Sequence, residues 1–316
     1  MRRIVVLIAL PLLATVGLTA CGSSVPPNPD TSVAATGTFG KSPSVTIPAQ
    51  KAGSALTVKT LITGSGVALA KTDAFVGNYA AYIWSGSTHK LAQSTWTNGS
   101  PAVFSGQLLP GLETGLRGKK MGSRVLVVIP PKDAYGSQGN TQAGIKPTDT
   151  LVFVVDLIKN FAAKASASGQ QVSGGGSGLP TVGAQLGSVP SVSIPSTSPP
   201  GTLAAKTLIK GSGPAIVKGQ TVVTQYVGLI WKSKKTFDSS WQRSAPFGFT
   251  IGKSPSQVIP GWDKGLLGQT VGSRVLLVIP PADGYGSTGN SQAGITGKDT
   301  LVFVVDVLGA FSAGSA

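Results

Sequence analysis

Apolar residues occur along the chain in short runs bounded by Gly, Pro and Asp, without the three- and four-residue spacing of long amphipathic helices. These runs are rich in β-branched and aromatic residues and therefore predict β-strands, most clearly at residues 221–231, 274–279 and 300–307. One short helix is expected at residues 258–267, because Pro260 suits a first helical turn and a glycine follows as a C-terminal cap.

The pattern occurs twice, about 150 residues apart, since residues 121–136 are nearly identical to residues 271–286. Solenoid repeats are only about 20–50 residues long, so this period is that of a whole domain. We therefore expect an α+β protein with two copies of one fold, each an antiparallel sheet of about five strands curled around one short helix. The first repeat comprises residues 43–163 and the second repeat residues 188–316.

The N-terminus predicts export. Arg2 and Arg3 precede an apolar stretch that is too short for a membrane span, so residues 1–20 are expected to be a signal peptide. The sequence Leu-Thr-Ala-Cys that ends at Cys21 resembles a bacterial lipobox, in which the cysteine carries the lipid. An ordinary signal peptide with an incidental cysteine is the alternative. Cys21 is the only cysteine, which excludes an intrachain disulfide.

Two segments contain few apolar residues. Residues 21–42 are expected to form a flexible, lipid-anchored stalk, and residues 164–187 a Ser/Gly-rich linker between the repeats.

The formal net charge of the chain is +15. For a protein at the outer face of a bacterial membrane, this charge favours attraction to anionic lipids and wall polymers. Nucleic acid is discounted as a partner, because the cations are scattered and no nucleic-acid motif accompanies them.

The second repeat carries six separated motifs in a fixed order over residues 226–306. They read Y-V-G, T-F-D-S-S, A-P-F-G-F, V-I-P-G-W-D-K-G-L, G-Y-G and T-L-V-F-V-V-D. In this order and spacing, residues 201–311 resemble the FKBP-type peptidyl-prolyl isomerases, the family that binds tacrolimus and rapamycin. The resemblance implies an apolar pocket between sheet and helix that isomerises X-Pro bonds. Together with the predicted export, it indicates an enzyme that assists the folding of exported polypeptides. Such chemistry breaks no covalent bond and requires no metal or cofactor.

The resemblance also assigns residues to this pocket. Catalytic positions are Tyr226, Phe237, Asp238, Trp262 and Tyr285, and substrate-binding positions are Phe247, Val258, Ile259, Ile295 and Phe303. It implies that Tyr285 donates a hydrogen bond to a substrate carbonyl. Asp238 is interpreted as an organiser, held by Arg243 and the Tyr226 hydroxyl, because a buried carboxylate needs partners. Asn290 departs from the family pattern, which often has His there, and is expected to alter partner preference.

Comparison of the repeats separates pocket from core. Taken alone, Trp262 would be assigned to the core, as Phe249 is. However, the first repeat keeps the scaffold glycines and lacks the pocket residues. It has Leu112 at the position of Trp262, Ala102 at the position of Phe247, and Ala92-Gln93 at the positions of Phe237-Asp238. Uncompensated losses of this kind in a packed core would cost about 3–5 kcal/mol each. We therefore expect the second repeat to hold the intact pocket and the first to be a degenerate copy.

His89 is the only histidine, which excludes a Ser-His-Asp triad and a multi-His metal site within the chain. It lies in a loop of the first repeat that is two residues longer than its counterpart, where exposure is expected. The alternative function is a non-catalytic peptide-binding chaperone or surface adhesin built on the same fold.

Overall fold

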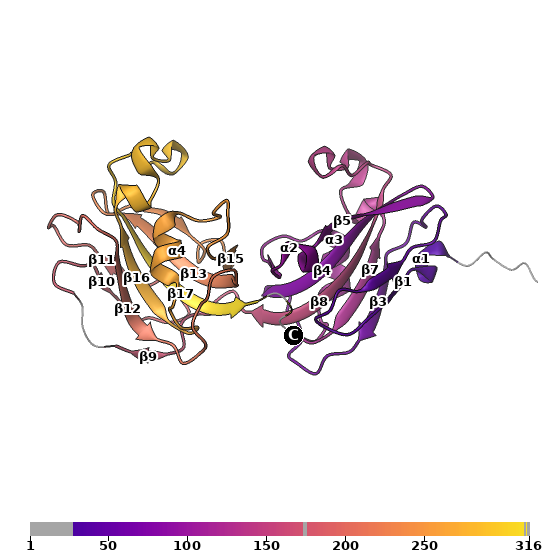
Figure 1. Cartoon of the computed structure of the whole chain (residues 1–316), viewed down its shortest axis with the longest axis horizontal. Coiled ribbons are helices and arrows are strands. Elements are labelled where there is room, and N and C mark those ends of the chain that lie inside the picture. Colours follow the sequence, from indigo (N-terminus) through magenta and orange to yellow (C-terminus); the bar gives the residue numbers. More distant parts are fainter. Residues whose placement is uncertain (1–27, 173–175, 313, 315–316) are drawn as a thin grey trace, which may run out of the picture.

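The computed structural model describes residues 28–172, 176–312 and 314, so the expected signal peptide and Cys21 lie outside the described residues. Each repeat forms an antiparallel sheet with a seven-residue helix against one face, and the two repeats lie side by side (Figure 1). The expected α+β architecture, with two copies of one fold, is confirmed. Among the described residues, no helix is long and apolar enough to cross a bilayer.

In the first repeat the strand order is β3-β7-β8-β4-β5, and the short strand β6 also pairs with β4. The strands are β3 (Thr57–Ile62), β4 (Ala74–Ser85), β5 (Thr88–Ser94), β6 (Ala102–Phe104), β7 (Arg124–Ile129) and β8 (Thr150–Phe161). The helices are α2 (Thr95–Asn98), α3 (Pro110–Leu116) and the 3₁₀ turns Pro131–Asp133, Gly136–Gln138 and Thr141–Ala143. The loop expected around His89 is in fact a β-hairpin, in which His89 pairs with Trp84 and is exposed.

In the second repeat the order is β14-β13-β17-β16-β12-β9, and β15 also pairs with β13. The strands are β9 (Gln170–Gln171), β12 (Ala204–Lys210), β13 (Thr221–Ile230), β14 (Thr236–Ser239), β15 (Phe247–Thr250), β16 (Arg274–Ile279) and β17 (Leu301–Phe311). The helices are α4 (Pro260–Leu266) and the 3₁₀ turns Pro281–Asp283, Gly286–Thr288 and Ser291–Ala293. The strands beyond the expected five are short edge segments.

The helix α4 lies very close to the sheet. A Cβ atom on Gly261 would be 2.6 Å from Cγ2 of Ile279, so only a glycine permits this approach. The helix begins at Pro260, and Gly268 follows its end with a φ of 81° that favours glycine. The short helix expected from these two residues is confirmed.

The opposite face of each sheet is covered by the segment that precedes it. In the first repeat this leader contains α1 (Pro29–Ser32), β1 (Ala34–Thr36) and β2 (Ser44–Thr46), and Val33 and Ile47 pack on the sheet. In the second repeat β10 (Thr181–Val182) pairs with β11 (Val192–Ser193), and Ile194 packs on the sheet.

The described residues of the expected stalk and linker include short regular elements. Residues 29–32 form α1, residues 34–36 form β1, and residues 170–171 form the edge strand β9. The apolar content of both segments is low, but a few buried side chains and hydrogen bonds to the sheet suffice to order them. Residues 21–27 lie outside the described part of the chain.

Each leader is tied to its sheet by a buried ion pair that the sequence analysis did not identify. Arg274 Nε donates to Asp306 Oδ1 at 2.6 Å, and its Nη1 donates to the carbonyl of Gln185 at 2.8 Å. The first repeat has the same pair in Arg124 and Asp156, also at 2.6 Å. Both carboxylates accept a further backbone N–H from the preceding segment. Both charges of each pair are therefore hydrogen-bonded to each other, as burial requires, although Arg124 Nη1 has no hydrogen-bond partner within the part of the chain that the structure describes.

The two repeats contact each other through equivalent surfaces. Strand β6 lies beside β15, and a Cβ atom on Gly248 would be 2.2 Å from Cγ2 of Val103, its counterpart in the first repeat. The Thr221 hydroxyl donates to the carbonyl of Pro101 at 2.7 Å. Equivalent apolar residues form one cluster across the contact: Val76 and Val223, Ile158 and Leu308, Phe161 and Phe311. The close fit fixes the repeats relative to one another.

Candidate functional site

A cleft of about 200 Å³ opens in the second repeat between the sheet and α4. Aromatic and aliphatic side chains form most of its wall, and a few polar groups stand at its rim. The lining residues are Tyr226, Phe237, Asp238, Phe247, Gln257, Val258, Ile259, Trp262, Tyr285 and Phe303. All the predicted site residues except Ile295 are brought together here.

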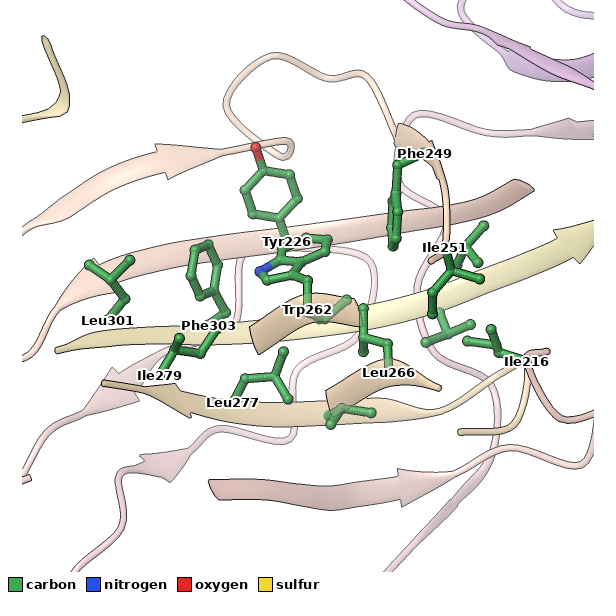
Figure 2. Packing of buried hydrophobic residues seen from close by; sticks show 14 of the residues in the cluster. Ile216, Tyr226, Phe249, Ile251, Trp262, Leu266, Leu277, Ile279, Leu301 and Phe303 are labelled. Atoms are coloured by element: carbon green, nitrogen blue, oxygen red, sulfur yellow. The ribbon is translucent and has the colours of Figure 1, made fainter. Parts of the chain in front are cut away.

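Trp262 forms the floor of this cleft. It projects from α4 toward β13 and β17, where the rings of Tyr226 and Phe303 meet it edge-on at centroid distances of 5.1 and 5.3 Å (Figure 2). Phe249 packs against it at 5.5 Å from the core side, as expected. The indole is only 3% exposed, yet it lines the cleft. Trp262 therefore belongs to both the core and the binding surface.

Phe237 and Phe247 form the side walls from the edge strands β14 and β15. The wall depends on Gly228 of β13, because a Cβ atom there would be 2.8 Å from Phe237 Cζ and 2.7 Å from Phe303 Cε1. The first repeat has Ala81 at this position and retains the equivalent of Phe303. Phe237 is thus the ring that requires the glycine, and the first repeat lacks both.

The polar rim is organised around Asp238. One carboxylate oxygen accepts a hydrogen bond from the Tyr226 hydroxyl, and the other accepts one from Arg243 Nη1. Arg243 Nη2 also donates to the Tyr226 oxygen at 2.9 Å, which closes the triangle. Burial raises the pKa of Tyr226, and the bond to Asp238 raises it further. Tyr226 is therefore a neutral hydroxyl that holds the carboxylate in place.

Tyr285 stands at the opposite side of the rim, between two 3₁₀ turns. Among the described residues, none accepts a hydrogen bond from its hydroxyl. The ring is half-buried, so this donor can face a ligand in the cleft. Val258 and Ile259 reach the cleft from the segment that leads into α4.

Two positions differ from the expectation. Ile295 is 4% exposed and belongs to the core cluster, and it is not among the residues that line the cleft. The Ile295 main chain pairs with Asn290, whose side-chain oxygen accepts the N–H of Ala293 at 3.3 Å. Gln257 lines the cleft and was missed, because a polar residue in a loop gives no pattern in the sequence. Its side chain is held by the N–H of Thr250 at 2.7 Å.

The strand register confirms the matching of the two repeats. In β14 Asp238 lies opposite Gly228, and in β5 Gln93 lies opposite Ala81. In the same way Phe247 lies opposite Thr224, and Ala102 lies opposite Gly77. The first repeat therefore has no carboxylate at the rim and no edge-strand ring at these positions.

The second-repeat cleft has the properties needed to bind and twist a prolyl amide. Apolar walls fit a pyrrolidine ring, and a rim donor can reach a neighbouring carbonyl. Rotation about the X-Pro bond crosses a barrier of about 18–20 kcal/mol, and a dry cleft favours the twisted amide, which is less polar than the planar one. Among the described residues, no three His, Cys, Asp or Glu gather as metal ligands. The fold and the cleft define the class of prolyl isomerases.

Comparison with known proteins gives the same class. The family model described as FKBP-type peptidyl-prolyl cis-trans isomerase matches residues 68–158 and 213–308. An FK506-binding protein of Streptomyces anulatus is 41% identical over 119 residues, which are 38% of this chain and 94% of that protein. Peptidyl-prolyl cis-trans isomerase FKBP1A of Xenopus laevis is 42% identical over 104 residues, or 33% of this chain and 93% of that protein. Among solved structures, FkpA from Escherichia coli is 37% identical, over 35% of this chain and 49% of that chain, with a TM-score of 0.32.

The chain belongs to the FKBP-type peptidyl-prolyl cis-trans isomerase family, and both repeats are members of it. The protein is an enzyme of this type.

Proposed function

We propose that the second repeat carries the isomerase activity and that the first repeat is weakly active or inactive. This proposal rests on the residues that differ at matched positions of the two repeats. Trp262 of α4 corresponds to Leu112 of α3. Phe237 and Asp238 of β14 correspond to Ala92 and Gln93 of β5. The fold is kept in both repeats, so the altered residues are those that folding does not require.

In the proposed mechanism the proline ring enters the second-repeat cleft and lies over the indole of Trp262. The rings of Phe237 and Phe247 exclude water from the amide, which disfavours its polar planar form relative to the twisted one. Tyr285 donates a hydrogen bond to a substrate carbonyl. Asp238 keeps Tyr226 and Arg243 in place and transfers no proton.

The role of Tyr285 gives a test with a matched control. Tyr285→Phe removes one hydroxyl without changing the ring, and it is expected to lower kcat/KM about three- to tenfold, the range for one neutral hydrogen bond. Tyr135→Phe is the same change at the equivalent position of the first repeat, and it has no such effect under the proposal. The measurement is the isomerisation rate of a short proline peptide by the whole chain. Equal losses in the two variants would contradict the assignment.

Tacrolimus- and rapamycin-type ligands are expected to bind in the same cleft. Several similar proteins are named for binding FK506, and the second-repeat cleft is apolar with donors at its rim. Inhibition of the wild-type rate by tacrolimus in the same assay checks this expectation.

We further propose that the enzyme acts on exported polypeptides while it is anchored to the outer face of a bacterial membrane. This part rests on the sequence of residues 1–21. Uncatalysed prolyl isomerisation takes tens to hundreds of seconds, which limits folding and prolongs exposure of unfolded chains.

Lipid attachment is tested at Cys21. In a bacterium that processes lipoproteins, the wild-type chain is expected to incorporate a labelled fatty acid and to fractionate with membranes. Cys21→Ser is expected to lose both properties, because multiple acyl chains supply the membrane affinity. Isomerase activity of the released protein serves as the control for folding. Membrane retention of the unlabelled Cys21→Ser variant would show that another feature provides the anchor.

A further inference from the structure

The first repeat contains a cavity at the place of the second-repeat cleft, and it is more than twice as large. Its volume is about 460 Å³, compared with about 200 Å³ in the second repeat. The enlargement follows from Leu112 and Ala92, which stand where Trp262 and Phe237 stand in the second repeat. The walls remain mainly apolar, with side chains that include Leu108, Leu109, Leu151 and Phe153. The cavity is too wide to grip a pyrrolidine ring, but it accommodates a bulky apolar side chain.

A third hollow, of about 190 Å³, lies at the contact between the repeats and is adjacent to each of the other two spaces. Tyr79 and Gln93 line both this hollow and the first-repeat cavity. At its other end, Gln257 lines both the hollow and the second-repeat cleft. In Figure 1, α2 of the first repeat lies on the side of that repeat that faces β15 of the second. The three spaces therefore lie next to one another and share walls, and together they are called the path below.

The middle of this path is polar. Its wall includes Thr95, Asn98, Ser100, Thr250 and Lys253. An extended peptide carries an N–H and a C=O at almost every residue, and these groups need partners when they leave water. Because the repeats are held together by the Val103–Gly248 fit and the Thr221 hydrogen bond, the path is formed before a ligand binds. Little ordering of the protein is then needed on binding.

We propose that one extended segment of an unfolded polypeptide occupies both repeats at once. Its proline lies in the second-repeat cleft, and a Leu, Phe or Trp side chain several residues away lies in the first-repeat cavity. The hydrophilic hollow between them contacts the connecting main chain. This inference rests on the proposed isomerase function of the second repeat and adds a substrate preference to it.

The test uses the whole chain and two series of peptides. Each peptide contains one X-Pro bond and one Leu, separated by spacers of increasing length, with Leu placed before the proline in one series and after it in the other. In one of the two series, we expect KM to be about tenfold lower at one range of spacer lengths than for the peptide with the shortest spacer, called the short peptide. The reason is that the Leu side chain is then buried in the first-repeat cavity. The same peptides with Ser in place of Leu are expected to show no fall.

Two variants locate the second contact. Leu112→Trp fills the first-repeat cavity with the side chain that the fold accepts at the equivalent position 262, and it is expected to abolish the tenfold difference between long and short peptides. Ala102→Phe, equivalent to Phe247, places a ring in the wall of the hollow beside the first-repeat cavity and is expected to act in the same way. The ratio of the two KM values is compared within each variant, so a change in overall activity does not affect the result.

The outcomes separate this inference from the proposed function. If the short peptide is turned over but Leu lowers KM at no spacer length, the bridging proposal is wrong and the isomerase assignment remains intact. A Leu effect that survives both Leu112→Trp and Ala102→Phe would also overturn it. Absence of turnover of the short peptide, or insensitivity to Tyr285→Phe, would instead overturn the assignment of the active repeat.

Discussion

The triple variant Phe237→Ala/Phe247→Ala/Trp262→Leu is expected to lose at least about 100-fold in kcat/KM, because the walls and floor of the second-repeat cleft are replaced by the residues of the first repeat. A 100-fold loss corresponds to about 2.7 kcal/mol of transition-state binding. For comparison, truncation of a single packed aromatic ring in a protein core lowers the free energy of unfolding by about 3–5 kcal/mol, which is more than this loss. The measurement is the isomerisation rate of a short proline peptide by the whole chain.

Loss of stability must be distinguished from loss of the cleft. Trp262 packs against four rings, so the variant is expected to unfold at a lower temperature, and activity is measured where circular dichroism shows a folded protein. Phe249→Leu is the matched control, since it perturbs the same aromatic cluster and leaves the cleft lining in place. This control is expected to melt earlier and retain its activity. A fully folded triple variant with undiminished turnover would show that the activity resides elsewhere.

The second large effect concerns stability. Arg274→Met is expected to destabilise the second repeat by about 3–5 kcal/mol, because it leaves the Asp306 carboxylate buried without its cation. The two side chains are only 1% and 2% exposed, so water does not compensate for the lost partner. The change also removes the donor for the Gln185 carbonyl in the leader. Urea unfolding followed by circular dichroism provides the measurement.

The double variant Arg274→Met/Asp306→Leu is the control for this result. It removes both charges and is expected to recover most of the stability, because replacing a buried pair by apolar residues of similar size is often neutral or stabilising. If Arg274→Met alone unfolds at the wild-type urea concentration, the pair does not hold the leader on the sheet.

The regular elements could be predicted because their signals are local. The apolar runs gave the long strands β13, β16 and β17, and Pro260 with Gly268 gave the ends of α4. The repeat supplied the most useful information about the site, since it separated residues that fold the domain from residues that differ between its copies. The triangle of Tyr226, Asp238 and Arg243 followed from the need of a half-buried carboxylate for partners.

Other features depend on contacts between distant residues and gave no local signal. The ordering of residues 28–42 requires Arg124 and Asp156, which lie far along the chain, and low apolar content alone suggested a flexible segment. Gln257 reaches the cleft only because its loop folds back beside β15. Ile295 belongs to the core cluster and is not among the residues that line the cleft, although the resemblance implied that it would be.

The contact between the repeats relates Phe161 to Phe311 and Val103 to Gly248, each residue meeting its own counterpart. Such a pairing follows a two-fold relation, and a two-fold contact is closed, because each partner uses the same patch. A third copy of the domain could not be added through this patch. One break in the symmetry, Gly for Val, lies where two identical bulky side chains would collide, so a dimer of identical domains could not form this contact with valine at that position. Fusion of the two copies in one chain allows each to carry a different residue there.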